Sequence, residues 1–548
     1  MIPISRILVC LVVEGFVAFS SSCLAAAPAP WVADNGDGTY KNPILYQDFS
    51  DPDVVRVGGD YYLTCSTFHV APGLTLLHSR DMVNWSYLTN PLKRLVPGKH
   101  FEAVRPSAGV WAPSIRHHDG KFWIFYPDPD FGIYVISAEN PAGPWTEPHL
   151  LIEGKGLIDP CPLWDEDGRA YVVHGWAKSR AGIGNRLTVR EISPDCTKLL
   201  DEGVVAIDGD KLPGYRTLEG PKFYKRDGWY YIFAPAGGVR NGWQSVFRSK
   251  NVRGPYEDRI VLEQGNTPIN GPHQGAWVDT PSGESWFFHF QEIDALGRVT
   301  HLQPMIWKDG WPVMGEDPDG DGKGQPVLVH KKPTVSGAAA LATPQVSDEF
   351  DGKQFGPQWQ WSANDEQTWS SLSAERGVLR LFVQPENEIG TLWHQPAVLT
   401  QRISGPASTV TTKLAFASEI AGASAGLVMM GDDYAWIGLR REGNTLRVVL
   451  KTGKGMKNVA PKEEIEVSNE PWKGGPIWLR VTNQGEKCRF SYSDDGKTFK
   501  AIGGEFVAKQ WGSWVGARVG LFAMSPRGTK ATGHADVDWF HVTAPENP

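Results

Sequence analysis

The chain has 548 residues, more than one hydrophobic core usually organises, so we expect at least two domains. Its formal net charge of −8 argues against nucleic acid as a partner, because nucleic-acid-binding proteins usually present a basic face. Hydrophobic residues make up 41% of the chain, as in ordinary globular proteins, while 23 Trp, 60 Gly and 41 Pro indicate many short strands, tight turns and flat apolar surfaces suited to sugar rings.

The N-terminus has the pattern of an export signal. Arg6 precedes an apolar run at 7–19, and small residues follow as far as Ala27. We therefore predict a signal peptide at 1–27 and a secreted or periplasmic protein. The run is too short for a permanent membrane span, and no later segment has 18 consecutive apolar residues. The residues before Cys23 match a lipoprotein cleavage site poorly, so a lipid anchor is not expected.

Removal of the signal peptide would leave four cysteines: Cys65, Cys161, Cys196 and Cys488. In an oxidising compartment four cysteines allow three complete pairings, and their spacing favours none of them. The sequence has no C-x-x-C or H-E-x-x-H motif, so it gives little support to a zinc site.

Between Asn42 and Trp311 one pattern occurs five times, a turn that ends in glycine and is followed closely by aromatic residues. The turn glycines are Gly59, Gly120, Gly168, Gly228 and Gly283. They lie 61, 48, 60 and 55 residues apart, a period that fits a four-stranded unit. No amphipathic helix of normal length interrupts the series. We therefore predict a five-bladed β-propeller at 40–330, because the alternative of two stacked β-sandwiches would not explain the period.

After Trp311 the repeated pattern ends. The segment 331–345 is rich in Pro, Ala and Thr and is predicted to be a linker. From Val346 onward, alternating runs such as GVLRLFVQ and IWLRVTN predict strands, and we expect a jelly-roll-like β-sandwich at 346–545. The predicted fold class is therefore all-β, in two domains.

Acidic residues recur near the predicted start of the innermost strands, which line the central channel of a propeller. Asp159 and Glu219 each lie nine residues before a turn glycine, as do Trp111 and Gln274, and Asp51 lies eight residues before one. We expect these three carboxylates to share one pocket, where burial and mutual repulsion raise at least one pKa. Such a set suits glycoside hydrolysis, and a calcium site is the alternative.

Several motifs support the first alternative. They are FSDPDVVRVGGDYYL, VWAPSIRHHDGKFWIFY, IDPCPLWDEDGRAYVVHG and LEGPKFYKRDGWYYI. In this order they closely resemble glycoside hydrolase family 43, the β-xylosidases, α-L-arabinofuranosidases and arabinanases with a five-bladed propeller. The resemblance covers about residues 40 to 315, and the C-terminal segment resembles the concanavalin-like sandwich attached to xylosidase-type members.

The resemblance implies a role for each acid. Asp51 would be the general base that activates a water, Glu219 the general acid that protonates the leaving group, and Asp159 the residue that tunes the pKa of the acid and holds it in place. Inversion requires base and acid roughly 6.5–9.5 Å apart. Asp53 would point to the same face of a strand as Asp51, and the family motif, which places the base before Pro, selects Asp51.

The resemblance also implies substrate-binding residues. Phe68 and Trp111 resemble walls of the first sugar subsite, with blade packing as the alternative. Arg298 resembles the arginine at the sugar site, with a surface salt bridge as the alternative. His273 resembles a channel histidine that in many members helps to bind a metal, often calcium, or orders water; a hydrogen-bonded rim histidine is the alternative.

No cofactor is expected to be required, and calcium remains open. The loop at 317–322 matches the start of a calcium loop, but Leu328 occupies the twelfth position, where such loops need Glu. A plain acidic turn is therefore favoured.

These observations predict a secreted, inverting exo-glycosidase that releases xylose from xylan-derived oligosaccharides. The alternatives are an α-L-arabinofuranosidase or a dual-activity enzyme on arabinoxylan, and a sugar-binding propeller without catalysis. A retaining fructosidase-type propeller is disfavoured, because Ser50 and Gly220 stand where that group expects Asn and Cys.

Overall fold

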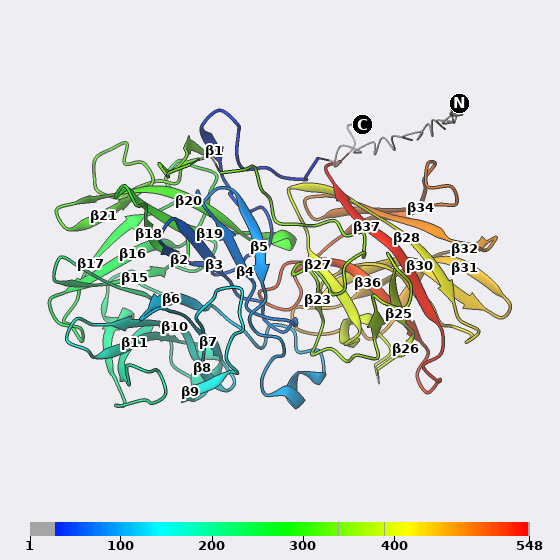
Figure 1. Ribbon diagram of the computed structural model, residues 1–548, viewed down its shortest axis with the longest axis horizontal. Coiled ribbons are helices and arrows are strands. Elements are labelled where there is room, and N and C mark those ends of the chain that lie inside the picture. Colours follow the sequence, from blue (N-terminus) through cyan, green and yellow to red (C-terminus); the bar gives the residue numbers. More distant parts are fainter. Residues whose placement is uncertain (1–27, 338, 388, 546–548) are drawn as a thin grey trace, which may run out of the picture.

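The computed structural model describes residues 28–337, 339–387 and 389–545, so the predicted signal peptide at 1–27 lies outside the described residues. Two all-β domains lie side by side (Figure 1). The α-helix of the described part, α1 (Lys178–Ala181), has four residues. No helix within the described ranges is long and apolar enough to cross a membrane.

The N-terminal domain consists of five antiparallel sheets, each built from four strands in chain order. The first blade contains β2 (Asp53–Val57), β3 (Asp60–Thr64), β4 (Leu76–Ser79) and β5 (Trp85–Thr89), and the second contains β6 (Ser114–His118), β7 (Lys121–Asp128), β8 (Gly132–Ala138) and β9 (His149–Glu153). The third contains β10 (Leu157–Trp164), β11 (Ala170–Trp176), β12 (Arg186–Ile192) and β13 (Val204–Asp208), and the fourth contains β14 (Lys222–Arg226), β15 (Trp229–Ala236), β16 (Trp243–Ser249) and β17 (Glu257–Leu262). The fifth contains β18 (Trp277–Asp279), β19 (Ser285–Ile293), β20 (Gly297–Lys308) and β21 (Trp311–Met314). The five-bladed propeller is confirmed. Each turn glycine follows the first strand of its blade. At Gly228 the backbone φ is +71°, a conformation that suits a residue without a Cβ.

The ring of blades closes without a strand exchanged between the first and last sheets. Instead, the segment before β2 lies along β20 of the last blade. The Asn42 side chain accepts a hydrogen bond from the Leu302 amide at 2.9 Å and donates one to its carbonyl at 2.8 Å. Further out, β1 (Thr39–Lys41) pairs with β22 (Val329–Lys331), so the two ends of the propeller chain are held together.

The C-terminal domain is the predicted β-sandwich. One sheet contains, in order, β23 (Gln360–Trp361), β27 (Val398–Arg402), β36 (Arg518–Ser525), β29 (Ser424–Met430), β30 (Asp433–Glu442), β31 (Thr445–Lys454) and β32 (Glu464–Trp472), with β26 (Gln384–Pro385) beside β36. The other contains β24 (Ser370–Ser371), β25 (Leu379–Phe382), β37 (His534–Thr543), β28 (Ala407–Ala417), β33 (Ile477–Gln484), β34 (Lys487–Ser493) and β35 (Lys500–Val507). In β33 the alternating Ile477, Leu479 and Val481 point into the core between the sheets.

The four cysteines of the described chain are all unpaired and buried. One lies in the first blade, two lie in the third blade and one lies in the sandwich, and burial raises the pKa of the Cys65 thiol to about 12. They therefore behave as small apolar core residues rather than as a disulfide framework.

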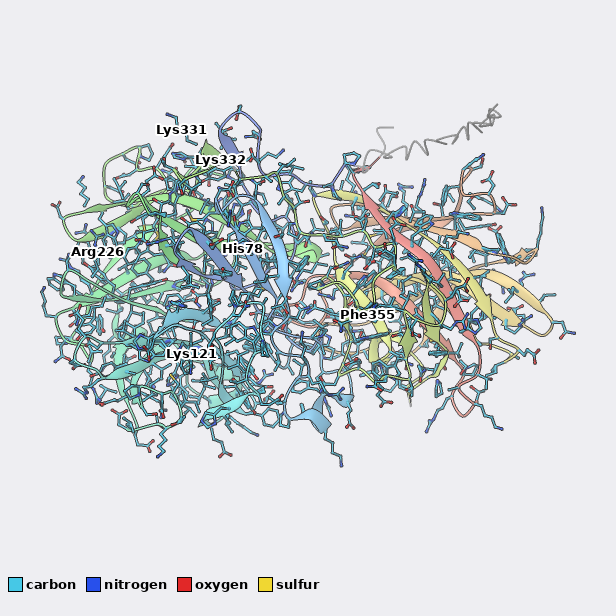
Figure 2. The ribbon with its side chains drawn as sticks, in the orientation of Figure 1. His78, Lys121, Arg226, Lys331, Lys332 and Phe355 are labelled. Carbon is cyan, nitrogen blue, oxygen red and sulfur yellow. The ribbon has the colours of Figure 1, made fainter. Side chains whose placement is uncertain are left out.

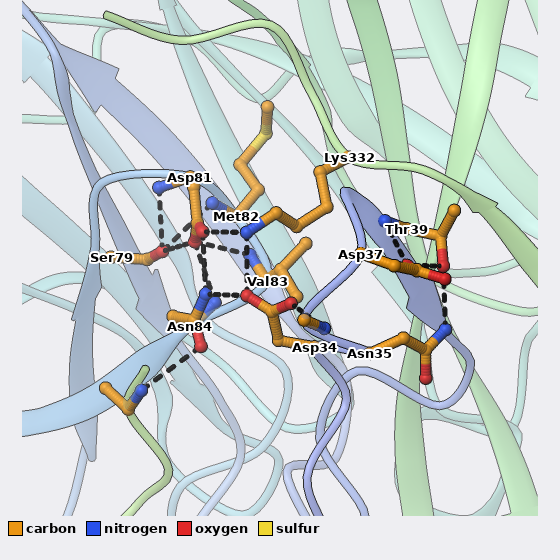
Figure 3. A network of polar contacts seen from close by, with 12 residues as sticks. Asp34, Asn35, Asp37, Thr39, Ser79, Asp81, Met82, Val83, Asn84 and Lys332 are labelled. Atoms are coloured by element: carbon orange, nitrogen blue, oxygen red, sulfur yellow. Dashed lines mark hydrogen bonds and ion pairs between the residues drawn. The ribbon is translucent and has the colours of Figure 1, made fainter. Parts of the chain in front are cut away.

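The segment predicted as a linker lies against the first blade (Figure 3). Lys332 reaches between two carboxylates, with its Nζ 2.7 Å from Asp34 and 3.6 Å from Asp81. Asn84 donates to both carboxylates, and its Oδ1 accepts from the Ala342 amide. The Asp34 and Asp81 side chains are only 8% and 3% exposed, so the Lys332 ammonium neutralises charge that water does not reach.

Substitution Lys332→Met should lower the free energy of unfolding by about 1–3 kcal/mol, because it leaves buried carboxylates without their cation. Burial alone would raise the pKa of Asp34, but hydrogen bonds from Asn84 and Lys332 hold it below its ordinary value. The stabilisation is therefore full at pH 7 and is lost as the pH falls through the lowered pKa. Thermal unfolding followed at pH 7 and at about pH 3 measures this.

Lys331→Met is the matched control, since the neighbouring Lys331 is exposed and lies outside the network (Figure 2). Equal destabilisation by both substitutions, or a Lys332→Met effect that grows in acid, would contradict this account of the network.

Candidate active site

A cavity of about 280 Å³ lies where the five blades meet the sandwich. All five blades contribute to its wall. The lining residues are Asp51, Phe68, Trp111, Ala112, Ile158, Asp159, Thr217, Glu219, Gly238, Val239, Gln274, Arg298 and Trp514. The structure thus brings together six of the seven predicted site residues in one cavity, and the seventh, His273, lies directly behind Glu219.

Strand pairing gives the true equivalence between blades. In each innermost strand one reference residue lies opposite the residue five places after the turn glycine, as in Asp53 with Thr64, Cys161 with Val173 and Lys222 with Phe233. In the last blade, Ala276 and Phe288 exchange backbone hydrogen bonds in the same way.

This register differs by one residue from the equivalence obtained by counting back from the turn glycines. Asp51, Asp159 and Gln274 are equivalent, whereas Glu219 lies one place earlier, with Trp111 and His273. The count was wrong because the third and fifth blades have one extra residue between this reference residue and the turn glycine. The predicted convergence of the three acids still holds.

Asp51 lies just before the first strand, with a φ of 55° that turns its side chain into the cavity. Its Oδ1 is 2.8 Å from Nη1 of Arg298, and its Oδ2 accepts from the Ser66 hydroxyl at 2.6 Å. Asp53 instead accepts from the Ile115 amide at 2.7 Å, in the neighbouring blade. The two acids therefore do not share a face as strand periodicity predicted, because the positive φ takes Asp51 out of the strand.

Asp159 holds the backbone beside Glu219. Its Oδ2 accepts a hydrogen bond from the Gly220 amide at 2.8 Å. Gly220 has a φ of +60°, and a Cβ there would lie 2.2 Å from Cγ of Gln274, so only glycine fits. The carboxyl group of Glu219 keeps access to the cavity, since its side chain is 27% exposed.

The surroundings favour the protonated form of Glu219. Burial raises the pKa of Glu219, the negative charge of Asp159 raises it further, and the positive charge of Arg298 opposes the shift. Burial likewise raises the pKa of Asp159, against the Gly220 hydrogen bond. Asp51 accepts a charge-assisted hydrogen bond from Arg298. One carboxyl group suited to donate a proton and one suited to accept a proton thus line the same cavity.

His273 is fully buried, and neither ring nitrogen has a hydrogen-bond partner. Burial lowers its pKa to about 3, with the charge of Arg298 acting in the same direction, so the ring is neutral. Its Nε2 lies 3.6 Å from Oε1 of Glu219. The described residues contain no group of three or more His, Cys, Asp or Glu side chains that could hold a metal ion.

The acidic loop at 317–322 forms a turn of its own. Asp317 accepts hydrogen bonds from the amides of Gly320 and Gly322 at 2.8 and 3.0 Å. Its carboxylate is thus engaged by backbone amides, as in an ordinary acidic turn.

Sequence reasoning missed two residues, Trp514, which lines the cavity, and Asp48, which holds the backbone beside it. Trp514 lies in the sandwich loop between β35 and β36, and its ring centroid is 6.2 Å from that of Trp111 and 5.4 Å from the Arg298 guanidinium carbon. Asp48 accepts from the Gly516 amide of this loop at 2.8 Å and from the Arg298 amide at 2.9 Å. No sequence spacing relates residue 514 to the propeller, so only the three-dimensional structure reveals this contribution.

A second cavity, of about 550 Å³, opens from the first. The two share five lining residues, namely Trp111, Ile158, Thr217, Glu219 and Trp514. Asp51, Gln274 and Arg298 line only the smaller cavity. Glu219 therefore lies at the junction of the smaller and the larger cavity.

Comparison with known proteins agrees with this geometry. Residues 40–312 match the glycosyl hydrolases family 43, and residues 347–543 match the β-xylosidase C-terminal concanavalin A-like domain. A Xylanibacter ruminicola protein named "Putative beta-xylosidase" is 41% identical over 490 residues, covering 89% of this chain and 86% of the relative. A β-xylosidase of Formosa agariphila is 33% identical over 574 aligned positions, covering 95% and 93%.

Among solved structures, that of a xylan β-1,4-xylosidase from Bacillus halodurans C-125 superposes with a TM-score of 0.80 at 26% identity, covering 92% of this chain and 99% of that one. Both domains and their order are shared with these relatives. The chain therefore belongs to glycosyl hydrolase family 43, the enzymes that hydrolyse O-glycosyl bonds.

Proposed function

We propose that the protein is an exo-acting, inverting β-xylosidase that releases xylose from the ends of xylan-derived oligosaccharides. The observation that carries the proposal is the position of Glu219 between the two cavities. A general acid must contact the oxygen that joins the released sugar to the leaving chain. The released sugar then occupies the small cavity with Asp51, and the leaving chain occupies the larger one.

In this mechanism Asp51 accepts a proton from a water, whose oxygen attacks the anomeric carbon. Glu219 gives its proton to the departing glycosidic oxygen as that bond breaks. Asp159 holds Gly220 and so fixes the backbone of the acid. Water and leaving group are on opposite faces of the sugar, so the product has the inverted configuration.

The exo action is attributed to the size of the small cavity and to its aromatic walls. Phe68 and Trp111 line it from the propeller, and Trp514 lines it from the sandwich. A volume of about 280 Å³ suits a single pentose with its attacking water, but not a chain that continues in both directions. A chain end is therefore the substrate.

Xylose is proposed as the sugar because the two most similar relatives compared above are named β-xylosidases. The same cavity would accept an arabinofuranosyl unit, whose hydroxyl groups are similarly arranged, so dual activity is the second candidate. Membership of a hydrolase family sets aside the non-catalytic sugar-binding alternative.

We propose further that the protein is exported, on the basis of the signal-like residues 1–27. Detection of the processed chain in the periplasm or medium of its host tests this. Retention of the full-length chain in the cytoplasm would contradict it.

Glu219→Gln should lower kcat on xylobiose by about 10²–10⁴-fold, because the leaving sugar then departs without a proton. An aryl β-xyloside with an activated leaving group should lose much less activity. Glu153→Gln, an exposed residue outside both cavities, is the control.

The proposed function is refuted if the wild type hydrolyses neither aryl β-xyloside nor aryl α-arabinofuranoside. NMR detection of net retention would refute the inverting mechanism.

The alkaline limb of the kcat/KM profile should move to lower pH in Asp159→Asn. The negative charge of Asp159 contributes to the raised pKa of Glu219, so its removal lets the acid lose its proton earlier as the pH rises. Asp167→Asn, an exposed turn residue of the same blade, should leave the limb unchanged. A limb that moves to higher pH, or shifts equally in both variants, would contradict the assignment.

Trp514→Ala should raise KM for xylobiose about three- to tenfold, because the small cavity loses an aromatic wall. Trp539→Ala, a half-buried sandwich tryptophan that lines neither cavity, serves as the control. Wild-type KM in Trp514→Ala would show that the sandwich loop does not contact the substrate.

A further inference from the structure

We propose that the larger cavity recognises a carboxylate on the leaving oligosaccharide, so that the enzyme prefers xylan fragments that bear a uronic acid. This inference rests on the proposed function, which places the leaving chain in that cavity. It concerns the substrate class and not the chemistry of cleavage.

The larger cavity has aromatic walls and a volume that suit a sugar chain. Tryptophan side chains Trp111, Trp176 and Trp514 line it, and flat aromatic faces stack on sugar rings. Its volume of about 550 Å³ is roughly twice that of the smaller cavity, so it has room for more than one ring. Polar groups of Ser179 and Asn185 also lie in its wall.

Its charge is opposite to that of the whole chain. The basic lining residues are Lys178, Arg186 and Arg216, and the acidic ones are Asp210 and the proton donor Glu219. The chain as a whole has a formal net charge of −8. A basic cavity beside the cleavage site of an acidic protein indicates selection for a negative group on the substrate.

Two of these cations have no acidic partner among the described residues. Arg186 lies 3.4 Å from both Asp208 and Asp210, so its charge is compensated within the protein. Lys178 and Arg216 are exposed side chains that form no ion pair in the described part of the chain. Both are therefore available to a ligand.

The position of Arg216 places this charge near the leaving group. Arg216 precedes Glu219 by three residues, and Thr217 between them lines both cavities. The Arg216 carbonyl accepts from the Gly237 amide at 2.7 Å, which fixes the backbone from which the guanidinium extends. Arginine binds a carboxylate through two parallel hydrogen bonds, and a lysine adds a second positive charge.

A matched set of three substrates tests the inference. They are a neutral xylo-oligosaccharide, the same oligosaccharide with glucuronic acid on its second xylose, and the methyl ester of that acid, which keeps the size but removes the charge. The wild type should show a kcat/KM for the acid about fivefold or more above those for the ester and the neutral chain. The preference should decrease as salt is added.

In the double variant K178Q/R216Q the ratio of kcat/KM for acid and ester should fall to about one. Lys155→Gln, an exposed lysine outside the cavity, should retain the wild-type ratio. The inference is overturned if the wild type treats acid and ester alike, or if K178Q/R216Q keeps the preference. Failure to cleave any aryl xyloside would instead refute the proposed function, so the two failures are distinguishable.

Discussion

The buried carboxylate of Asp48 joins the parts from which the active site is assembled. It is 7% exposed and accepts hydrogen bonds from the Arg298 amide, the Gly516 amide and the Ser50 hydroxyl. These groups belong to the last blade, the sandwich loop and the turn that precedes Asp51. One carboxylate thus sets the relative positions of the proposed base, its arginine partner and the loop with Trp514, because an unpaired buried charge would be costly.

The fit around Asp48 leaves no room for larger residues. A Cβ on Gly516 would lie 3.1 Å from Cβ of Asp48 and 3.0 Å from Cα of Gly297, and a Cβ on Gly297 would lie 2.5 Å from Cγ of Asp48. From the sandwich, Arg402 of β27 donates to the Asp48 carbonyl at 2.7 Å. The domains therefore meet through close backbone packing and buried hydrogen bonds, and the sandwich forms part of the active site as well as a separate fold.

The sequence was sufficient to predict the blades because each depends on a local signal, a glycine turn followed by aromatic residues. It also predicted that Asp51, Asp159 and Glu219 converge in one cavity, since each acid lies near the start of an innermost strand. It did not give their register, because one extra residue in the third blade shifts Asp159 relative to its turn glycine. Asp48 and Trp514 escaped prediction for another reason, since their roles depend on contacts between the two domains.

The pKa of Glu219 depends on how far neighbouring carboxylates balance the positive charge of Arg298. Alone, this buried guanidinium would lower the pKa of the acid and favour loss of its proton. Arg298 is instead engaged by Asp51 at 2.8 Å and by Glu292 at 3.7 Å, and Glu292 is itself paired with Arg240 at 3.2 Å. Its charge is thus largely balanced by these carboxylates, which limits how far it lowers the pKa of Glu219. The same arginine thus contacts the proposed base directly, while burial and the charge of Asp159 oppose its lowering effect on the pKa of the proposed acid.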